Sequence, residues 1–163
     1  MKYFKSILFF LSTLVVLSCS SDDGKISFTL LQLNDVYEIS SIQGGKFGGM
    51  ARVKTIHKEL LKENKNTLLV MAGDFLNPSL IGTMKYNGER IRGKQMVEVM
   101  NAMNFDVAAF GNHEFDLSKK DLQTRMDESI FPWISSNVFN RTKDSIKRFY
   151  QEINGLKTPI KGS

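Results

Sequence analysis

Apolar runs of strand length recur along this chain, and segments with helical periodicity separate them. The runs cover residues 26–33, 67–72, 105–110 and 131–138. Near-continuous apolar character is typical of parallel strands that are covered on both faces. Strands that alternate with helices predict an α/β fold with a mostly parallel sheet built from βα repeats.

Three segments between these runs carry helix signals. The first extends from Met50 to about residue 64 with apolar residues on one face, and the third covers residues 118–128 behind a Ser118–Asp121 capping box. The second begins at Gly93. Its stripe consists of Met96, Val97, Met100 and Met103. We interpret this stripe as core packing, not as a metal-binding methionine cluster.

The composition fits one globular domain. The chain has 163 residues, of which 42% are hydrophobic and 24% charged, and this excludes a disordered chain. Without Lys2 and Lys5 of the N-terminal segment, 20 basic side chains face 17 acidic ones. That surplus is too small for a nucleic-acid-binding face, so we expect no nucleic-acid partner.

The N-terminus has the features of an export signal. Lys2 and Lys5 precede an apolar run over residues 7–17, which is too short to cross a bilayer and ends just before Cys19. The Leu17-Ser18-Cys19 end resembles a bacterial lipobox. The resemblance implies a signal peptide over residues 1–18, lipidation of Cys19, a polar tether over 19–25, and an exported lipoprotein on the membrane, facing the periplasm or cell surface. The alternative is an incidental thiol.

Polar residues follow three of the predicted strands. Asp35, Asp74 and Asn112 stand at these ends, and parallel strands bring such ends to one edge of a sheet. Carboxylate and amide oxygens suit divalent cations such as Mg²⁺, Mn²⁺ or Ca²⁺, and Zn²⁺ where imidazole joins them. The alternative is that these residues only form turns, which Asp and Asn favour.

His113 follows Asn112 directly, and Asp116 lies three residues further on. A carboxylate at that spacing can orient an imidazole beside a metal site. A buried turn histidine is the alternative. The other histidine, His57, lies within the first helical segment, where we expect a surface or boundary residue.

Five motifs together resemble the calcineurin-like metallophosphoesterases, and more narrowly their secreted 5'-nucleotidase and UDP-sugar hydrolase branch. They are Leu33-Asn34-Asp35, Gly48-Gly49-Met50-Ala51-Arg52, Ala72-Gly73-Asp74-Phe75, Gly111-Asn112-His113-Glu114-Phe115-Asp116 and Ser136-Asn137-Val138. The resemblance implies an α/β/β/α sandwich. It also implies that Asp35 binds one of two divalent metal ions, Asp74 bridges both and Asn112 binds the second.

The resemblance further implies that His113, paired with Asp116, stabilises the transition state or protonates the leaving group. A metal-activated water would attack the phosphorus of a phosphorylated small molecule, with a nucleotide as the family-level expectation. One departure concerns Tyr37, where the family has a metal-binding His. Either one metal is held more weakly, or Glu38 or a water replaces that ligand.

A second departure is more serious, because the chain has only two His and none after His113. We therefore expect residues 26–163 to form the N-terminal part of a truncated catalytic domain, with one sheet face uncovered. Two hypotheses stay open. One is a phosphoester hydrolase whose site is completed by self-association or by the missing C-terminal half, and the other is a catalytically incomplete lipoprotein fragment.

Overall fold

A computed structural model describes residues 24–162, so the predicted signal peptide and Cys19 lie outside the described residues. A four-stranded sheet runs through the molecule in the order β1-β2-β5-β6, with every pair parallel. The strands are β1 (Thr29–Leu33), β2 (Thr67–Met71), β5 (Val107–Ala109) and β6 (Trp133–Ile134). The predicted α/β class with a parallel sheet is confirmed.

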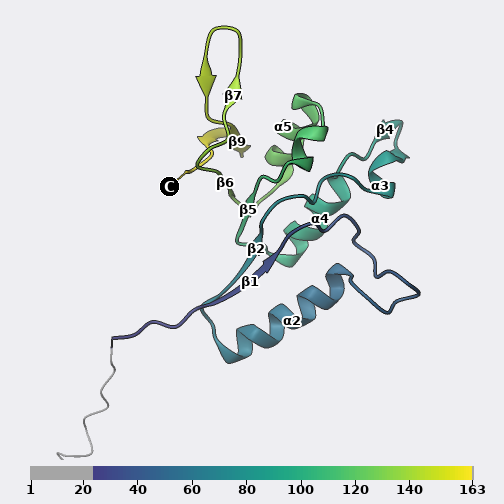
Figure 1. Cartoon of the computed structure of the whole chain (residues 1–163), viewed down its shortest axis with the longest axis vertical. Coiled ribbons are helices and arrows are strands. Elements are labelled where there is room, and N and C mark those ends of the chain that lie inside the picture. The colour runs from purple at the N-terminus through teal and green to yellow at the C-terminus, as the bar shows by residue number, and fades with distance from the viewer. Residues whose placement is uncertain (1–23, 163) are drawn as a thin grey trace, which may run out of the picture.

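Helices occupy the connections between the strands (Figure 1). They are α2 (Met50–Glu63), α3 (Leu80–Thr83), α4 (Lys94–Met103), the 3-10 helix η1 (His113–Asp116) and α5 (Lys119–Glu128). The three long helices are those that the sequence predicts. The Ser118 hydroxyl accepts a hydrogen bond from the Asp121 amide at 3.1 Å and thereby caps α5, as expected.

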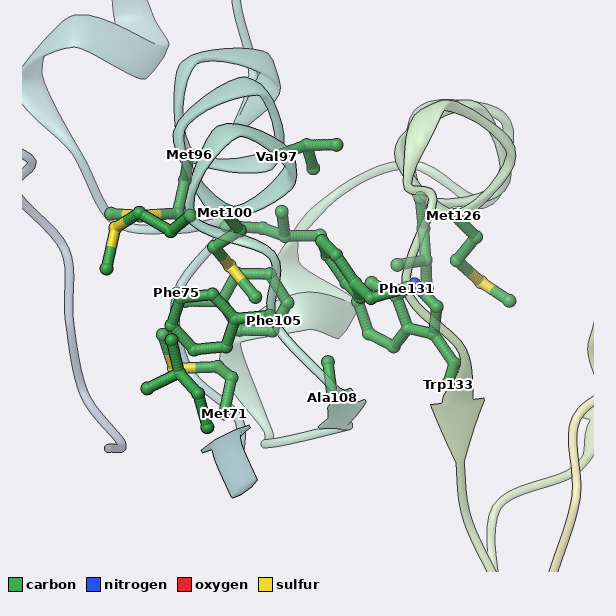
Figure 2. Packing of buried hydrophobic residues seen from close by; sticks show 14 of the residues in the cluster. Met71, Phe75, Met96, Val97, Met100, Phe105, Ala108, Met126, Phe131 and Trp133 are labelled. Atoms are coloured by element: carbon green, nitrogen blue, oxygen red, sulfur yellow. The ribbon is translucent and has the colours of Figure 1, made fainter. Parts of the chain in front are cut away.

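The core lies between the sheet and helices α4 and α5. In Figure 2, Met96 and Met100 of α4 lie next to Phe75 and Met71, which confirms the core interpretation of the methionine stripe. Phe131 and Trp133 lie next to Met126 of α5 in the same view. These aromatic side chains interdigitate, with the Phe75 and Trp133 rings 5.3 Å apart.

All four strands are shorter than the apolar runs predict, and β5 and β6 keep half of their run or less. Just before β5, the Asp106 carboxylate accepts a hydrogen bond from the Leu69 amide at 2.7 Å, beside the 2.9 Å bond from the Asp106 amide to the Leu69 carbonyl. After β6, the Ser135 hydroxyl accepts from the Val138 amide at 3.1 Å and turns the chain. Side-chain hydrogen bonds of this kind end a strand where apolar character alone continues it.

The opposite face of the sheet carries exposed apolar side chains. Along β2, Leu69 and Met71 are fully buried, whereas Leu68, next to Leu69, is 43% exposed. Leu30 on β1 is 52% exposed, and Phe28 before β1 is 68% exposed. The uncovered sheet face that the sequence predicts is therefore present in the described part of the chain.

The sequence predicts no element after residue 140, but the structure forms hairpins there. They pair β7 (Asn140–Arg141) with β8 (Ile146–Lys147), and β9 (Tyr150–Ile153) with β10 (Leu156–Pro159). The first hairpin extends away from the body of the molecule (Figure 1). The second packs on α5, because the buried Gln151 amide donates to the Met126 and Ser129 carbonyls at 3.0 and 2.8 Å.

His57 of α2 is buried, with 4% exposure, so the expected surface or boundary position is wrong. Its Nδ1 has no hydrogen-bond partner within the described residues.

Among residues 24–162, no helix is both long and apolar enough to cross a bilayer.

Candidate active site

Asp35 and Asp74 lie next to each other at the carboxyl ends of β1 and β2. The Asp35 amide donates to the Gly73 carbonyl at 3.2 Å, directly before Asp74. Both aspartates adopt a left-handed backbone, with φ of 55° and 58°. Non-glycine residues adopt this conformation rarely, and it often marks functional positions.

Two glycines allow the loops after β2 and β5 to meet. A Cβ on Gly73 would lie 2.4 Å from the Gly111 nitrogen, and a Cβ on Gly111 would lie 2.2 Å from an oxygen of Asp74. Gly73 also has φ of 96°, which side chains rarely permit. These contacts leave room only for glycine, and they bring Asp74 against the loop that carries His113.

Glu114 fixes this junction, and sequence reasoning missed its role. Its carboxylate is fully buried and accepts hydrogen bonds from four backbone amides. The donors are Asp74 at 2.8 Å, Phe75 at 2.9 Å, Leu76 at 3.2 Å and Gly111 at 2.7 Å. A glutamate in a polar turn normally suggests exposure, so no local pattern in the sequence indicated this role.

His113 is held between Asp74 and Asp116. Its backbone amide donates to the Asp74 carboxylate at 2.7 Å, and its Nδ1 lies 2.7 Å from Asp116 Oδ2. The hydrogen bond to Asp116 raises the pKa of His113, against the smaller opposing effect of burial. The same hydrogen bond lowers the pKa of Asp116. A 3.1 Å hydrogen bond from the side-chain amide of Asn77 adds a smaller effect in the same direction.

Tyr37 contacts both Asp35 and His113. Its hydroxyl donates to Asp35 Oδ1 at 2.9 Å, and its ring stands perpendicular to the His113 ring, with centroids 5.9 Å apart. Burial, followed by the bond to Asp35, raises the pKa of Tyr37 to about 12, so the phenol is neutral at physiological pH. Hydrogen bonds from Asn34 and then Tyr37 lower the pKa of Asp35.

Glu38 points elsewhere. Its carboxylate accepts a hydrogen bond from the Leu80 amide at 3.2 Å, at the start of α3. One oxygen of Glu38 is thus engaged at α3, and its replacement of the histidine stays a prediction.

The five residues predicted from the sequence thus gather at one sheet edge. Asp35, Asp74, His113 and Asp116 are joined by the contacts above, and Asn112 lies between Gly111 and His113 in the same loop. No Lys or Arg of the described residues forms an ion pair with Asp35 or Asp74. Uncompensated carboxylates at one edge fit a divalent cation.

The protein donors are nevertheless few. Within residues 24–162, no three His, Cys, Asp or Glu side chains are close enough to form a metal centre by themselves. The available set is two carboxylates and the Asn112 amide oxygen, whereas divalent cations in proteins take about four to eight ligands in all. The site therefore fits part of a metal coordination sphere.

Comparisons with known proteins identify the family of this chain. A family model described as calcineurin-like phosphoesterase matches residues 28–157. The snake venom 5'-nucleotidase of Crotalus adamanteus is 34% identical over 148 residues, which cover 85% of this chain and 23% of the relative. The 5'-nucleotidase of Homo sapiens is 30% identical over 149 residues, which cover 85% of this chain and 24% of the relative.

Among solved structures, the 5'-nucleotidase precursor of Thermus thermophilus superposes with a TM-score of 0.60 at 21% identity. The match covers 82% of this chain and 28% of that structure, and it shows a shared fold. The chain thus spans about a quarter of the length of these relatives. With the family model covering residues 28–157, this chain belongs to the calcineurin-like phosphoesterase family.

Proposed function

We propose that this chain carries the phosphoester-hydrolysing site of a 5'-nucleotidase-like enzyme. The observation that carries the proposal is the His113–Asp116 pair, hydrogen-bonded at 2.7 Å and held against Asp74 by the His113 amide. An imidazole fixed in this way is oriented for acid catalysis or for stabilising charge on a phosphate. The substrate would be a nucleotide, as the names of the relatives suggest.

The residues take distinct roles in this proposal. His113 donates a proton to the leaving-group oxygen or stabilises its charge, and Asp116 keeps the His113 ring oriented and favours its protonated form. Tyr37 stays neutral and holds the Asp35 carboxylate through their hydrogen bond. Glu114 keeps the loops after β2 and β5 together, so it positions Asp74 and His113 and touches no substrate.

Calcineurin-like phosphoesterases use divalent metal ions. We propose two ions here, of Mn, Zn, Mg or Ca, with Asp35 on one, Asp74 between them and Asn112 on the second. When bound, they would supply positive charge to the phosphate and acidify a coordinated water. The remaining ligands would come from water, substrate or groups outside the described residues.

The test is hydrolysis of AMP and p-nitrophenyl phosphate by the full chain, first in EDTA and then with added Mn²⁺ or Zn²⁺. We expect metal-dependent activity that falls by about 100-fold or more in the His113→Ala variant. His57→Gln is the matched control, because His57 is the other histidine and lies in α2. Equal activity in wild type and His113→Ala would contradict the role of His113.

A second candidate function rests on the small donor set. No three His, Cys, Asp or Glu side chains of residues 24–162 form a metal centre, which favours a catalytically incomplete lipoprotein fragment as the alternative. A folded preparation without activity that still binds Mn²⁺ through Asp35 and Asp74 would favour this candidate. Asp74→Asn should weaken that binding in a calorimetric titration.

We also propose that the protein is exported and anchored through Cys19, with residues 19–25 as a tether before the domain of residues 26–163. The support is the order of basic residues, apolar run and Cys19 in the sequence. In bacterial cells fed a labelled fatty acid, the chain should acquire label and sediment with membranes. Cys19→Ser should abolish both results, and label that persists in this variant would contradict the anchor.

A further inference from the structure

In the hairpin of β3 (Lys85–Tyr86) and β4 (Glu89–Arg90), two positively charged residues lie opposite each other. Its register pairs Lys85 with Arg90, at directly opposite positions of an antiparallel pair. The two-residue turn Asn87-Gly88 has φ of 51° and 85°, which is typical of a tight hairpin with one fixed register. Like charges directly opposite each other destabilise a hairpin, so this pair has a cost in the absence of an anion.

More cations surround this pair. A surface cavity of about 450 Å³ is lined by Lys85, Arg90, Arg92 and Lys120, together with Arg125, Glu89 and Asp121. Asp121 forms an ion pair with Arg92 and accepts a hydrogen bond from the Ser118 hydroxyl, and Arg125 forms an ion pair with Glu128. The side chains of Lys85, Arg90 and Lys120 form no ion pair with any described residue. Within the same part of the chain Glu89 forms no ion pair either, so three free cations and one free carboxylate leave a surplus of two positive charges to bind an anion.

This cavity continues toward the candidate active site. A second cavity, of about 280 Å³, shares Arg90, Arg92, Ser118 and Asp121 with the first. It is also lined by Asp116, the partner of His113, and by Asn77, whose side-chain amide donates to Asp116. Figure 1 shows α3 and β4 gathered at this end of the molecule, near α4 and α5. The two cavities are thus neighbours that share one wall, and we treat them together as one groove from Asp116 to the Lys85–Arg90 pair.

We propose that this groove binds a second phosphate group on the leaving-group side of the substrate, an inference that rests on the proposed function. His113 would act at the leaving-group oxygen, and the groove starts at its partner Asp116. The carboxylate of Asp116 repels an anion next to it, so the second phosphate lies further out, between Lys85 and Arg90. The substrate class is a phosphomonoester whose leaving group carries another phosphate.

The first arm of the test measures binding without catalysis. Inorganic diphosphate is titrated calorimetrically into the full chain in EDTA, with wild type compared with the double variant Lys85→Gln/Arg90→Gln. We expect affinity to fall by about tenfold, because charge-assisted hydrogen bonds are lost. The matched control is Lys58→Gln/Lys62→Gln, another exposed pair of like charges, on α2. Equal affinity in wild type and Lys85→Gln/Arg90→Gln would overturn the proposal.

The second arm identifies the source of the anion. AMP and adenosine 3',5'-bisphosphate differ by one phosphate, so the ratio of their kcat/KM values reports recognition of that group. In Lys85→Gln/Arg90→Gln this ratio should shift by about tenfold against the bisphosphate, mainly through KM. An unchanged ratio with lost diphosphate binding would mean that the groove takes a free anion, which overturns the substrate assignment.

The two arms also separate this inference from the proposed function. If the wild-type chain hydrolyses neither nucleotide, the proposed function fails, whereas diphosphate binding still decides whether the groove recognises phosphate. Folding is checked by thermal unfolding. Diphosphate should raise the midpoint of the wild type and not that of Lys85→Gln/Arg90→Gln. The ligand-free variant should unfold no earlier than wild type, because its like-charge pair is gone.

Discussion

At the scale of single residues, the closeness of Gly73 and Gly111 decides how the candidate site is assembled. Each position lacks space for a Cβ, and the atoms in the way are backbone and the Asp74 carboxylate. Backbone atoms cannot rotate aside as the end of a flexible side chain can. The loops after β2 and β5 therefore meet only because both residues are glycine.

Gly111→Ala should destabilise the fold and displace Asp74. The new methyl group would meet Asp74 Oδ1 at 2.2 Å, so we expect a loss of about 3 kcal/mol or more in the free energy of unfolding. Urea denaturation measures it. Gly82→Ala is the control, because the nearest atom to its added Cβ is a Ser79 side-chain carbon at 3.6 Å, an ordinary contact. Similar losses in both variants would contradict the steric explanation.

Glu114 makes a second prediction at this scale. In Glu114→Gln, an NH₂ group would face amide donors that now bond to a carboxylate oxygen. Buried donors would lose their acceptor, so we expect the free energy of unfolding to drop by about 3 kcal/mol. Glu98→Gln, on the exposed side of α4, should stay within about 0.5 kcal/mol of wild type. Chemical denaturation of both variants checks this difference.

The sequence predicted which polar residues gather better than it predicted what holds them. Asp35, Asp74 and Asn112 follow apolar runs, and the parallel sheet explains why they share an edge. Glu114 was missed because a carboxylate in a turn is normally exposed, and its burial depends on donors from another loop, 38 to 40 residues away. Such contacts leave no local pattern in the sequence.

At the scale of elements, helices were predicted better than strands. The helix expected from Met50 to about residue 64 ends at Glu63, and its apolar periodicity is a local signal in the sequence. The run over residues 131–138 gave only β6 (Trp133–Ile134), since Ser135 bonds the Val138 amide. Periodicity also misjudged His57, which α2 buries although a lysine follows it directly.

The burial of His57 predicts how stability depends on pH. Burial, followed by the charge of Lys54, lowers the pKa of His57 below its usual 6.5. The unfolded chain then binds this proton more readily, so the contribution of His57 to stability is full above pH 6.5 and is lost as pH falls through the lower folded pKa. Urea midpoints measured from about pH 8 to pH 5 should fall more steeply in wild type than in His57→Gln.

The other histidine provides an internal comparison for this experiment. Asp116 raises the pKa of His113, so His113 stabilises the fold below pH 6.5 and loses that contribution as pH rises through its folded pKa. The two histidines thus act in opposite directions. Because His113 is present in both proteins, the difference between wild type and His57→Gln isolates His57. Parallel pH profiles would contradict the role given to its burial.

At the scale of the whole molecule, the uncovered sheet face is the main feature. Apolar side chains on β1, on β2 and before β1 remain exposed there, and contiguous patches of this kind promote association. We expect the chain to self-associate in sedimentation velocity experiments. Leu30→Gln/Leu68→Gln should weaken association by about tenfold.

The control for this prediction is Leu80→Gln. Leu80 is 75% exposed, more than Leu30 or Leu68, but it lies on α3 and not on the sheet. If exposure anywhere were enough, this variant would weaken association as well. A monomer at every concentration, with a cooperative unfolding transition, would show that the uncovered face does not drive association.

The hydrogen bonds of Glu114 have a consequence for how this fold meets phosphate. Many phosphate sites surround their ligand with free backbone amides at the start of a helix or in a glycine-rich loop. Here four such amides already point inward to a carboxylate of the protein itself, which takes the place that an external anion has in those sites. A phosphate at this edge is therefore left to side chains and cations, and its affinity should vary with metal supply.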